Sequence, residues 1–238
     1  MSRMPRAVLP GVPHHLTQRG VNRQRVFFSE QDHRIYLDVV VRAAEESGVS
    51  LIGYCLMPNH VHWVVIPEKP DSLARAFGRA HNRYANWGNA QFQRSGHFWQ
   101  NRFFSCALDD AHLCAALRYV ELNPARSGLV DAATDWPWSR AAAHVGRGPA
   151  PKWLDLSQWQ WRYGAVEWSV YLSAPTVTDA AQILRANTYT GRPVGTPEFV
   201  KRAEAELGRT LQPSKPGRKP KTRTAAGSIQ PLLFDQGN

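Results

Sequence analysis

Met57–Ile66, with the sequence MPNHVHWVVI, predicts a strand that presents two histidines. The stretch ends in three β-branched residues, which favour extended chain. Because side chains alternate between the faces of a strand, His60 and His62 project to one side, while Val61 and Trp63 face the other side and a core. Two neighbouring imidazoles can hold one divalent metal ion. A His-x-His pair also arises by chance, so ordinary surface or core histidines are the alternative.

Residues 109–124, with the sequence DDAHLCAALRYVELNP, predict a helix. Asp109 or Asp110 can cap its start. Pro124 biases Asn123 away from the α conformation, so we expect the helix to end there. Helical spacing marks a buried face made of Leu113, Leu117 and Val120.

Tyr119 lies about 200° around the helix axis from Leu117, so it belongs to another face. That face carries small and polar residues, namely His112, Ala115, Ala116 and Asn123. We therefore expect Tyr119 to reach outward, where its hydroxyl is available for chemistry. The alternative is a tyrosine whose ring packs in the protein and whose hydroxyl makes a structural hydrogen bond.

Together these two stretches resemble the single-tyrosine HUH transposases, and within them the branch called REP-associated tyrosine transposases. The resemblance rests on MPN-HVH at residues 57–62 and on RYVELNPARSGLV at residues 118–130. It extends to HHLTQRG at residues 14–20 and GHFWQNRF at residues 96–103. The pairing of the histidine motif with the Tyr-x-x-x-Asn-Pro motif is specific, although neither motif is specific alone.

The resemblance implies an activity. Tyr119 would attack single-stranded DNA, form a 5′-phosphotyrosine link and free a 3′-hydroxyl. A second 3′-hydroxyl could then reverse the step, giving rejoining or strand transfer. The substrates implied are short palindromic repeats of the REP type, which fold as hairpins beside a conserved tetranucleotide.

For the metal we expect His60 and His62 as ligands, with the side-chain oxygen of Asn123 as a third. Nitrogen and oxygen ligands suit Mg²⁺ or Mn²⁺ in an open site, although imidazole would also take Zn²⁺. Insertion-sequence relatives have Gln where this chain has Asn123, and the shorter amide reaches less far. A free phenol has a pKa near 10, so a metal or cation is needed to favour phenolate. No general base is obvious, and His112 is the candidate that the same helix offers.

Composition points to a polyanionic partner. The chain has 238 residues, 43% of them hydrophobic, and a net charge of +10, with a pI near 9.9. Three cysteines without a Cys-x-x-Cys motif argue against a disulfide framework or a cysteine zinc site. With no apolar run of membrane-spanning length, we expect a soluble, cytoplasmic protein without membrane contact.

The order strand, helix, strand, strand, helix, strand, helix predicts an α+β fold, a ferredoxin-like split βαβ sandwich with an antiparallel sheet and a C-terminal helical and basic extension. Besides the histidine strand, we expect strands at residues 15–19, 49–57 and 99–108. Helices are expected from Ser29 to Gly48, from Asp71 or Ser72, over residues 178–187 and from Thr196 to Gly208. The predicted domains are residues 1–135 (catalytic), 136–212 (Trp-rich helical extension) and 213–238 (basic disordered tail).

Two features of the sequence suggest DNA contacts. Six tryptophans could stack on nucleobases, although packing in a satellite helical layer is the favoured alternative; they are Trp136, Trp138, Trp153, Trp159, Trp161 and Trp168. Basic residues could grip phosphates, although a basic turn is also compatible with a solvated loop. The cations assigned to DNA are Arg19, Arg23, Arg25, Arg102, Lys215, Arg218, Lys219, Lys221 and Arg223.

Two function classes remain open. The first is a DNA nickase and strand-transferase, which the presence of both histidines, Tyr119 and Asn123 favours. The second is a domesticated hairpin-DNA binder that regulates or structures its target without cutting it. A metal phosphoesterase for small substrates is disfavoured by the positive charge. Either a monomer or a homodimer is compatible with the sequence.

Overall fold

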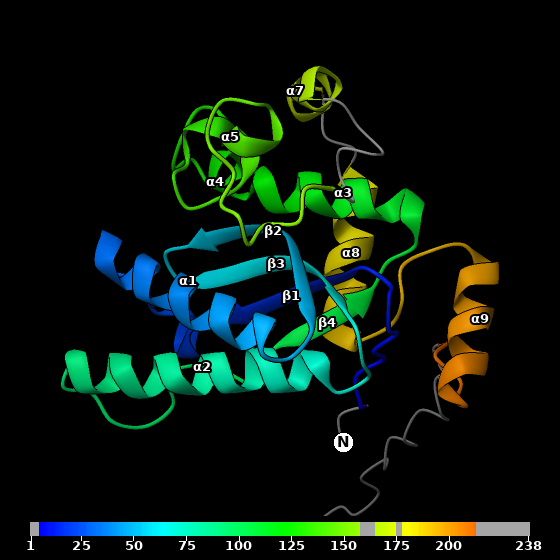
Figure 1. Cartoon of the computed structure of the whole chain (residues 1–238), viewed down its shortest axis with the longest axis horizontal. Coiled ribbons are helices and arrows are strands. Elements are labelled where there is room, and N and C mark those ends of the chain that lie inside the picture. The colour runs from blue at the N-terminus through cyan, green and yellow to red at the C-terminus, as the bar shows by residue number, and fades with distance from the viewer. Residues whose placement is uncertain (1–4, 158–164, 175–177, 213–238) are drawn as a thin grey trace, which may run out of the picture.

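An antiparallel sheet of four strands lies at the centre of the described part of the protein (Figure 1). The computed structural model describes residues 5–157, 165–174 and 178–212. The strands are β1 (His14–Arg19), β2 (Val49–Met57), β3 (His60–Pro67) and β4 (Phe104–Ala107), in the spatial order β2-β3-β1-β4. With one helix between β1 and β2 and another between β3 and β4, the predicted ferredoxin-like split βαβ fold is confirmed.

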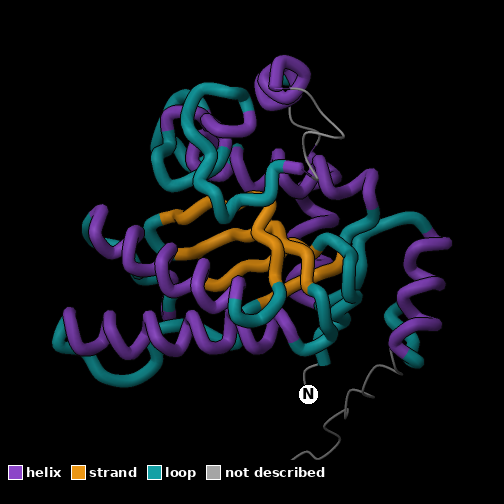
Figure 2. The backbone as a smooth tube through the Cα atoms, in the orientation of Figure 1, coloured by secondary structure: helices purple, strands orange, loops and turns teal. Residues whose placement is uncertain are grey.

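Two long helices cover one face of the sheet, α1 (Glu30–Glu45) and α2 (Ser72–Gln91) (Figures 1 and 2). Val61 and Trp63 of β3 point into this layer and are fully buried, as predicted, and the Trp63 ring packs against Phe77 of α2. These alternate residues of β3 therefore anchor the strand in a core. Their neighbours, the two histidines, are left facing the opposite side.

The opposite face is covered by α3 (Asp110–Glu121) and α8 (Thr178–Thr190). Leu113, Leu117 and Val120 of α3 are buried, which confirms the predicted face. The remaining elements are shorter or peripheral: η1 (Val21–Arg23), α4 (Asn123–Arg126), η2 (Ala133–Asp135), α5 (Ala141–His144), α7 (Ala165–Ser173) and α9 (Pro197–Leu207). Within the described ranges, no helix is both long and apolar enough to cross a membrane.

A buried carboxylate joins α3 to the C-terminal extension. Glu121 is fully buried and accepts hydrogen bonds from Nδ1 of His144 on α5 and from Nε1 of Trp168 on α7, the latter at 2.8 Å. Burying a carboxylate requires such partners, because an unpaired charge is costly in the interior. The helix that carries Tyr119 is thus fixed to residues of α5 and α7, which follow it in the chain.

The described tryptophans of the extension pack against the sandwich. Trp168 is fully buried, and three others are half-buried against the two cores: Trp136, Trp138 and Trp153. Trp136 also donates from Nε1 to the backbone oxygen of Leu56 on β2 at 3.0 Å. These contacts fit the packing alternative. Trp159 and Trp161 lie outside the described residues.

The predicted strand over residues 99–108 is wrong in its first half. Only Phe104–Ala107 pairs along β1, and Trp99 makes an isolated bridge with Gly20. The physical reason is aromatic burial, because Trp99 turns into the core beside α2 and donates from Nε1 to the backbone oxygen of His81 at 2.9 Å. A continued ladder with β1 would not place this ring against α2.

Two predicted helix ends also differ from the structure. α3 ends at Glu121, but Pro124 lies inside the next short helix, α4, because proline is tolerated in the first turn of a helix. α8 runs to Thr190, beyond the predicted end at residue 187. The start of α1 is as predicted, with Ser29 and Asp32 forming a complete capping box.

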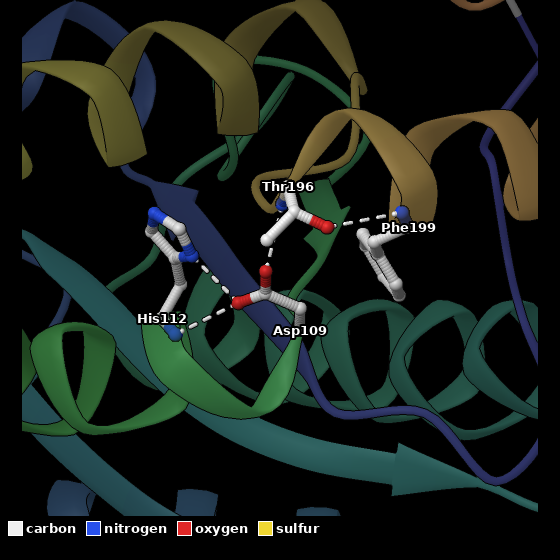
Figure 3. A network of polar contacts seen from close by, with 4 residues as sticks. All are labelled: Asp109, His112, Thr196 and Phe199. Atoms are coloured by element: carbon white, nitrogen blue, oxygen red, sulfur yellow. Dashed lines mark hydrogen bonds and ion pairs between the residues drawn. The ribbon is translucent and has the colours of Figure 1, made fainter.

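Asp109 connects the start of α3 to α9 (Figure 3). Its Oδ1 accepts from the backbone N–H of His112 at 2.9 Å and from Nδ1 of the same histidine at 2.6 Å. Its Oδ2 accepts from the backbone N–H of Thr196 at 2.8 Å, and Thr196 in turn caps α9 by accepting from Phe199 N. The carboxylate of Asp109 therefore accepts hydrogen bonds at the start of α3 and beside the start of α9.

Replacing this carboxylate should destabilise the fold measurably. Asp109→Ala removes an N-cap and the link to α9, so we expect a loss of about 1–3 kcal/mol in the free energy of unfolding. Urea denaturation measures it. Asp38→Ala, at an exposed position within α1, is the control and should change stability by less than about 0.5 kcal/mol. Equal stabilities for the two variants would contradict the capping role.

Candidate active site

Three histidines from β1 and β3 lie together on the sheet face under α3. Thr17 pairs with His62 and Arg19 with His60, so His15 is the diagonal neighbour of His62 on the same face. Nε2 of His15 and Nδ1 of His62 are 2.9 Å apart. The rings of His60 and His62 are perpendicular, with centroids 5.0 Å apart. As predicted, the strand places His60 and His62 on the same face of the sheet. His15 of β1 lies on that face as well.

Tyr119 lies beside these histidines and does not reach outward as expected. Only 7% of the residue is exposed. Its ring meets those of His15 and His62 edge-on, with centroid distances of 5.8 and 5.6 Å. The reason for the error is that α3 is covered on more than one side, by the sheet and by α8, so a residue off the Leu117 face still faces protein.

A cleft of about 490 Å³ opens beside the tyrosine and the histidines. Its walls come from β1, β3, the ends of α3 and α4, and α8. The residues that line it are His15, Arg19, Arg23, His60, His62, Tyr119, Asn123, Ser127, Arg185, Thr188 and Tyr189. The lining contains three arginines and no aspartate or glutamate, so the cleft is suited to an anion.

Helix α8 contributes three lining residues that sequence reasoning missed: Arg185, Thr188 and Tyr189. The side chain of Tyr119 raises the pKa of Arg185, so this guanidinium lies near the tyrosine side chain. The Tyr189 ring packs on Phe104 of β4 at a centroid distance of 4.8 Å. The sequence offered no signal beyond the positive charge of Arg185, because nothing local relates α8 to the distant Tyr119.

Arg126 and Asn123 hold the other side of the tyrosine. The guanidinium of Arg126 lies over the Tyr119 ring, 4.3 Å from its centroid. It donates from Nη2 to the backbone oxygen of Tyr119 and to Oδ1 of Asn123, both at 3.0 Å. Nδ2 of Asn123 also donates to the Tyr119 backbone oxygen, at 3.1 Å. The amide is therefore oriented with its oxygen toward a cation.

Asn59, next to the first histidine of the motif, sets the orientation of His60. Its Nδ2 donates to the backbone oxygen of Arg23 at 3.1 Å, so its Oδ1 is available as an acceptor. Nδ1 of His60 donates to that oxygen at 2.6 Å. Nε2 of His60 is then the nitrogen that carries the lone pair. The sequence motif contained Asn59, but its role follows only from the geometry.

The histidines of the cleft are held without charge. Burial lowers the pKa of His60 to about 3, and the nearby guanidinium groups of Arg19 and Arg185 act in the same direction. Burial also lowers the pKa of His15 to about 3. The pKa of His62 lies well below its ordinary value, first through burial and then through the surrounding imidazoles and arginines. Neutral imidazole is the form that binds a metal ion.

The donor set fits an open metal site in part. Nε2 of His60 and Nε2 of His62 have no hydrogen-bond partner among the described residues. Over the same ranges, no group of three or more His, Cys, Asp or Glu side chains could hold an ion. Any third protein ligand must therefore be of another type, and Asn123 is near enough to line the same cleft. Its oxygen already accepts one hydrogen bond, which leaves one lone pair.

The predicted DNA-contacting cations are only partly brought together. Arg19 and Arg23 line the cleft, and Nε of Arg19 is buried with no hydrogen-bond partner among the described residues. Arg25 is exposed outside the lining, and Arg102 lines separate hollows near α2 and α8. The cations from Lys215 to Arg223 lie outside the described residues.

His112 is not placed to act as a general base. It sits at the start of α3 and is bound to Asp109 (Figure 3). Tyr119 is seven residues further on, roughly 10 Å along the helix axis. This distance and the bond to Asp109 count against His112, the candidate that the same helix offered.

Comparison with known proteins finds a family similar to part of the chain. Residues 11–123 match the family profile described as "Transposase IS200 like". The profile covers 113 of the 238 residues, a little under half of the chain. The matched range ends at Asn123, so it includes the histidines and Tyr119 but not α8.

The chain is also similar to REP-associated tyrosine transposases. It is 28% identical over 110 residues to a Haemophilus influenzae protein described as a putative member of that group, a match covering 41% of this chain and 62% of that protein. The chain thus spans less than two thirds of that relative. It is 22% identical over 156 residues to the REP-associated tyrosine transposase of Escherichia coli K12, covering 63% of this chain and 89% of the relative.

A solved structure shares the fold. The structure of a REP-associated tyrosine transposase bound to a REP hairpin aligns with a TM-score of 0.51 and 21% identity. The alignment covers 63% of this chain and 89% of the other. At this identity the likeness supports the arrangement of strands and helices alone.

The buried histidines predict acid sensitivity. Burial lowers the pKa of His14 to about 4 and those of His15 and His81 to about 3, from 6.5. Below pH 6.5 the unfolded chain binds protons that the folded chain does not, so stability falls as the pH drops toward 4. Each such histidine contributes a slope of up to about 1.4 kcal/mol per pH unit. Urea denaturation from pH 7 to pH 5 measures the loss, and a constant free energy of unfolding would contradict it.

Proposed function

We propose that this protein is a metal-dependent single-stranded DNA nickase and strand-transferase that acts on palindromic hairpins through Tyr119. The observation that carries the proposal is the position of Tyr119 in one arginine-lined cleft with His60 and His62. A tyrosine that only packed in a core would not need cations around its hydroxyl. The match to the transposase profile supports the choice of substrate, as does the REP hairpin bound to the transposase whose structure shares this fold.

The proposed step balances as a transesterification. The Tyr119 oxygen bonds to the scissile phosphorus as the bond from phosphorus to the 3′ oxygen breaks. The phenol loses a proton, and the departing 3′ oxygen takes one up to become a hydroxyl. The strand downstream of the break remains linked to the tyrosine through its 5′ phosphate, and attack by a 3′-hydroxyl reverses the step without an external energy source.

Charge complementarity supports a phosphate in this cleft. Arg185 lies near the Tyr119 side chain, and its cation would stabilise negative charge on the attacking oxygen. Arg19 and Arg23, from the end of β1 and the following turn, can contact phosphate oxygens. Guanidinium groups suit this role because they can bind phosphate through two parallel hydrogen bonds.

We propose His60 and His62 as metal ligands through Nε2, with Asn123 as the third. When bound, a divalent ion such as Mg²⁺ or Mn²⁺ supplies charge to a non-bridging phosphate oxygen. With two imidazoles and no carboxylate in the lining, phosphate and water oxygens are needed to complete the coordination. We therefore propose that the metal ion binds tightly only when DNA is bound.

Removal of one oxygen atom tests the nucleophile. Tyr119→Phe keeps the ring and removes the hydroxyl, so a structural tyrosine would lose only about 1 kcal/mol of stability and would leave cleavage intact. We expect no covalent product from this variant with 3′-labelled hairpin DNA and Mn²⁺ on denaturing gels. The DNA should carry the palindromes that flank the gene.

Tyr189→Phe is the matched control, because Tyr189 lines the same cleft. This variant should form the covalent product as the unaltered protein does. A labelled adduct that persists in Tyr119→Phe would move the role to another side chain. Hairpin binding without any adduct in the unaltered protein would favour the non-cleaving regulator.

A further inference from the structure

A chain of hydrogen bonds runs from α8 to the second histidine of the motif. Thr188, fully within α8, donates from Oγ1 to the backbone oxygen of Leu184 at 2.6 Å. The same oxygen lies 2.8 Å from Nδ1 of His15, and Nε2 of His15 lies 2.9 Å from Nδ1 of His62. Thr188, His15 and His62 are all buried. The contacts therefore connect the C-terminal extension to the cleft without exposure to solvent.

The directions of these bonds follow from one another. The proton of the Thr188 hydroxyl is used toward Leu184, so its oxygen can only accept from His15. His15 then carries its proton on Nδ1, and an imidazole without charge has a lone pair on the other nitrogen. His62 must donate from Nδ1 to that lone pair. The remaining nitrogen, Nε2 of His62, is left with a lone pair.

We propose that His15 and Thr188 are positioning residues that hold His62 in its Nδ1–H tautomer, with the Nε2 lone pair available to a divalent metal ion. The inference rests on the proposed function in treating His62 as a ligand. Residues that hydrogen-bond to a metal-binding histidine, without contacting the metal themselves, fix the orientation of its ring. Their loss typically lowers metal affinity by about 10–100-fold. The metal centre would thus depend on a helix outside the matched family domain.

A threonine hydroxyl that donates to the backbone oxygen four residues earlier is not by itself evidence for this inference. Thr190, on the same helix, also donates to the backbone oxygen four residues earlier, at 3.1 Å, and is exposed. Thr188 differs because its oxygen also meets His15, and because Cys106 of β4 approaches the same oxygen at 3.2 Å. An oxygen with two lone pairs can accept from both. Thr190 therefore provides a matched control for the same substitution.

Nuclear magnetic resonance of the imidazole nitrogens tests the tautomer directly, without metal or DNA. In the unaltered full-length protein we expect His62 with a proton on Nδ1 and none on Nε2; the reverse would overturn the proposal even if no variant folded. In Thr188→Val, which removes the hydroxyl but keeps the shape, we expect the Nε2–H tautomer to become populated. Thr188→Ser should restore the original state, and Thr190→Val should not change it.

Metal affinity provides the second readout. Co²⁺, which imidazole sites bind more tightly than Mn²⁺, is titrated by calorimetry into each protein with hairpin DNA already bound, and every protein carries Tyr119→Phe so that the DNA is not cleaved. We expect Thr188→Val to bind it about 10–100-fold more weakly, and Thr188→Ser and Thr190→Val to bind it as the protein with Tyr119→Phe alone does. An unchanged tautomer or unchanged affinity in Thr188→Val would overturn the proposal. Failure of the proposed function would be seen separately, as an absence of nicking with the tautomer intact.

Discussion

The register of β1 against β3 is the constraint on which the cleft depends. Thr17 lies opposite His62, and this places His15 diagonally beside it on the same face. A shift of one residue would turn His15 to the α1 and α2 side and would break its contact with His62. Leu16 of β1, buried in the opposite core, makes such a shift costly, because it would have to exchange faces with His15. The packing of one face thus fixes the chemistry of the other.

Electrostatics distinguish this cleft from an ordinary metal site. Arg19, Arg23 and Arg185 line it, and no carboxylate offsets their charge. A divalent cation is repelled by such surroundings unless an anion enters with it. A DNA phosphate satisfies the arginines and supplies oxygen ligands at once, so substrate and metal are expected to bind cooperatively. This coupling would restrict the chemistry to the moment when DNA is present.

Local patterns were enough to predict the fold and half of the candidate site. The alternation of β3 predicted the shared direction of His60 and His62, and helical spacing predicted the buried face of α3. The direction of Tyr119 was not predictable from α3 alone, because it depends on the sheet and on α8 closing around that helix. Arg185 and Thr188 could not be assigned either, since their contacts with Tyr119 and His15 join segments that are distant in the sequence.

The most direct test is a crystal structure of the Tyr119→Phe protein with hairpin DNA and Mn²⁺, with the metal located by its anomalous scattering. The predicted result is one peak within coordination distance of Nε2 of both His60 and His62, with a phosphate oxygen on the same ion and arginines on the phosphate. A phosphate bound in the cleft with no ion at the histidines, or an ion bound elsewhere, would contradict the proposal that this cleft is a metal-dependent nicking centre.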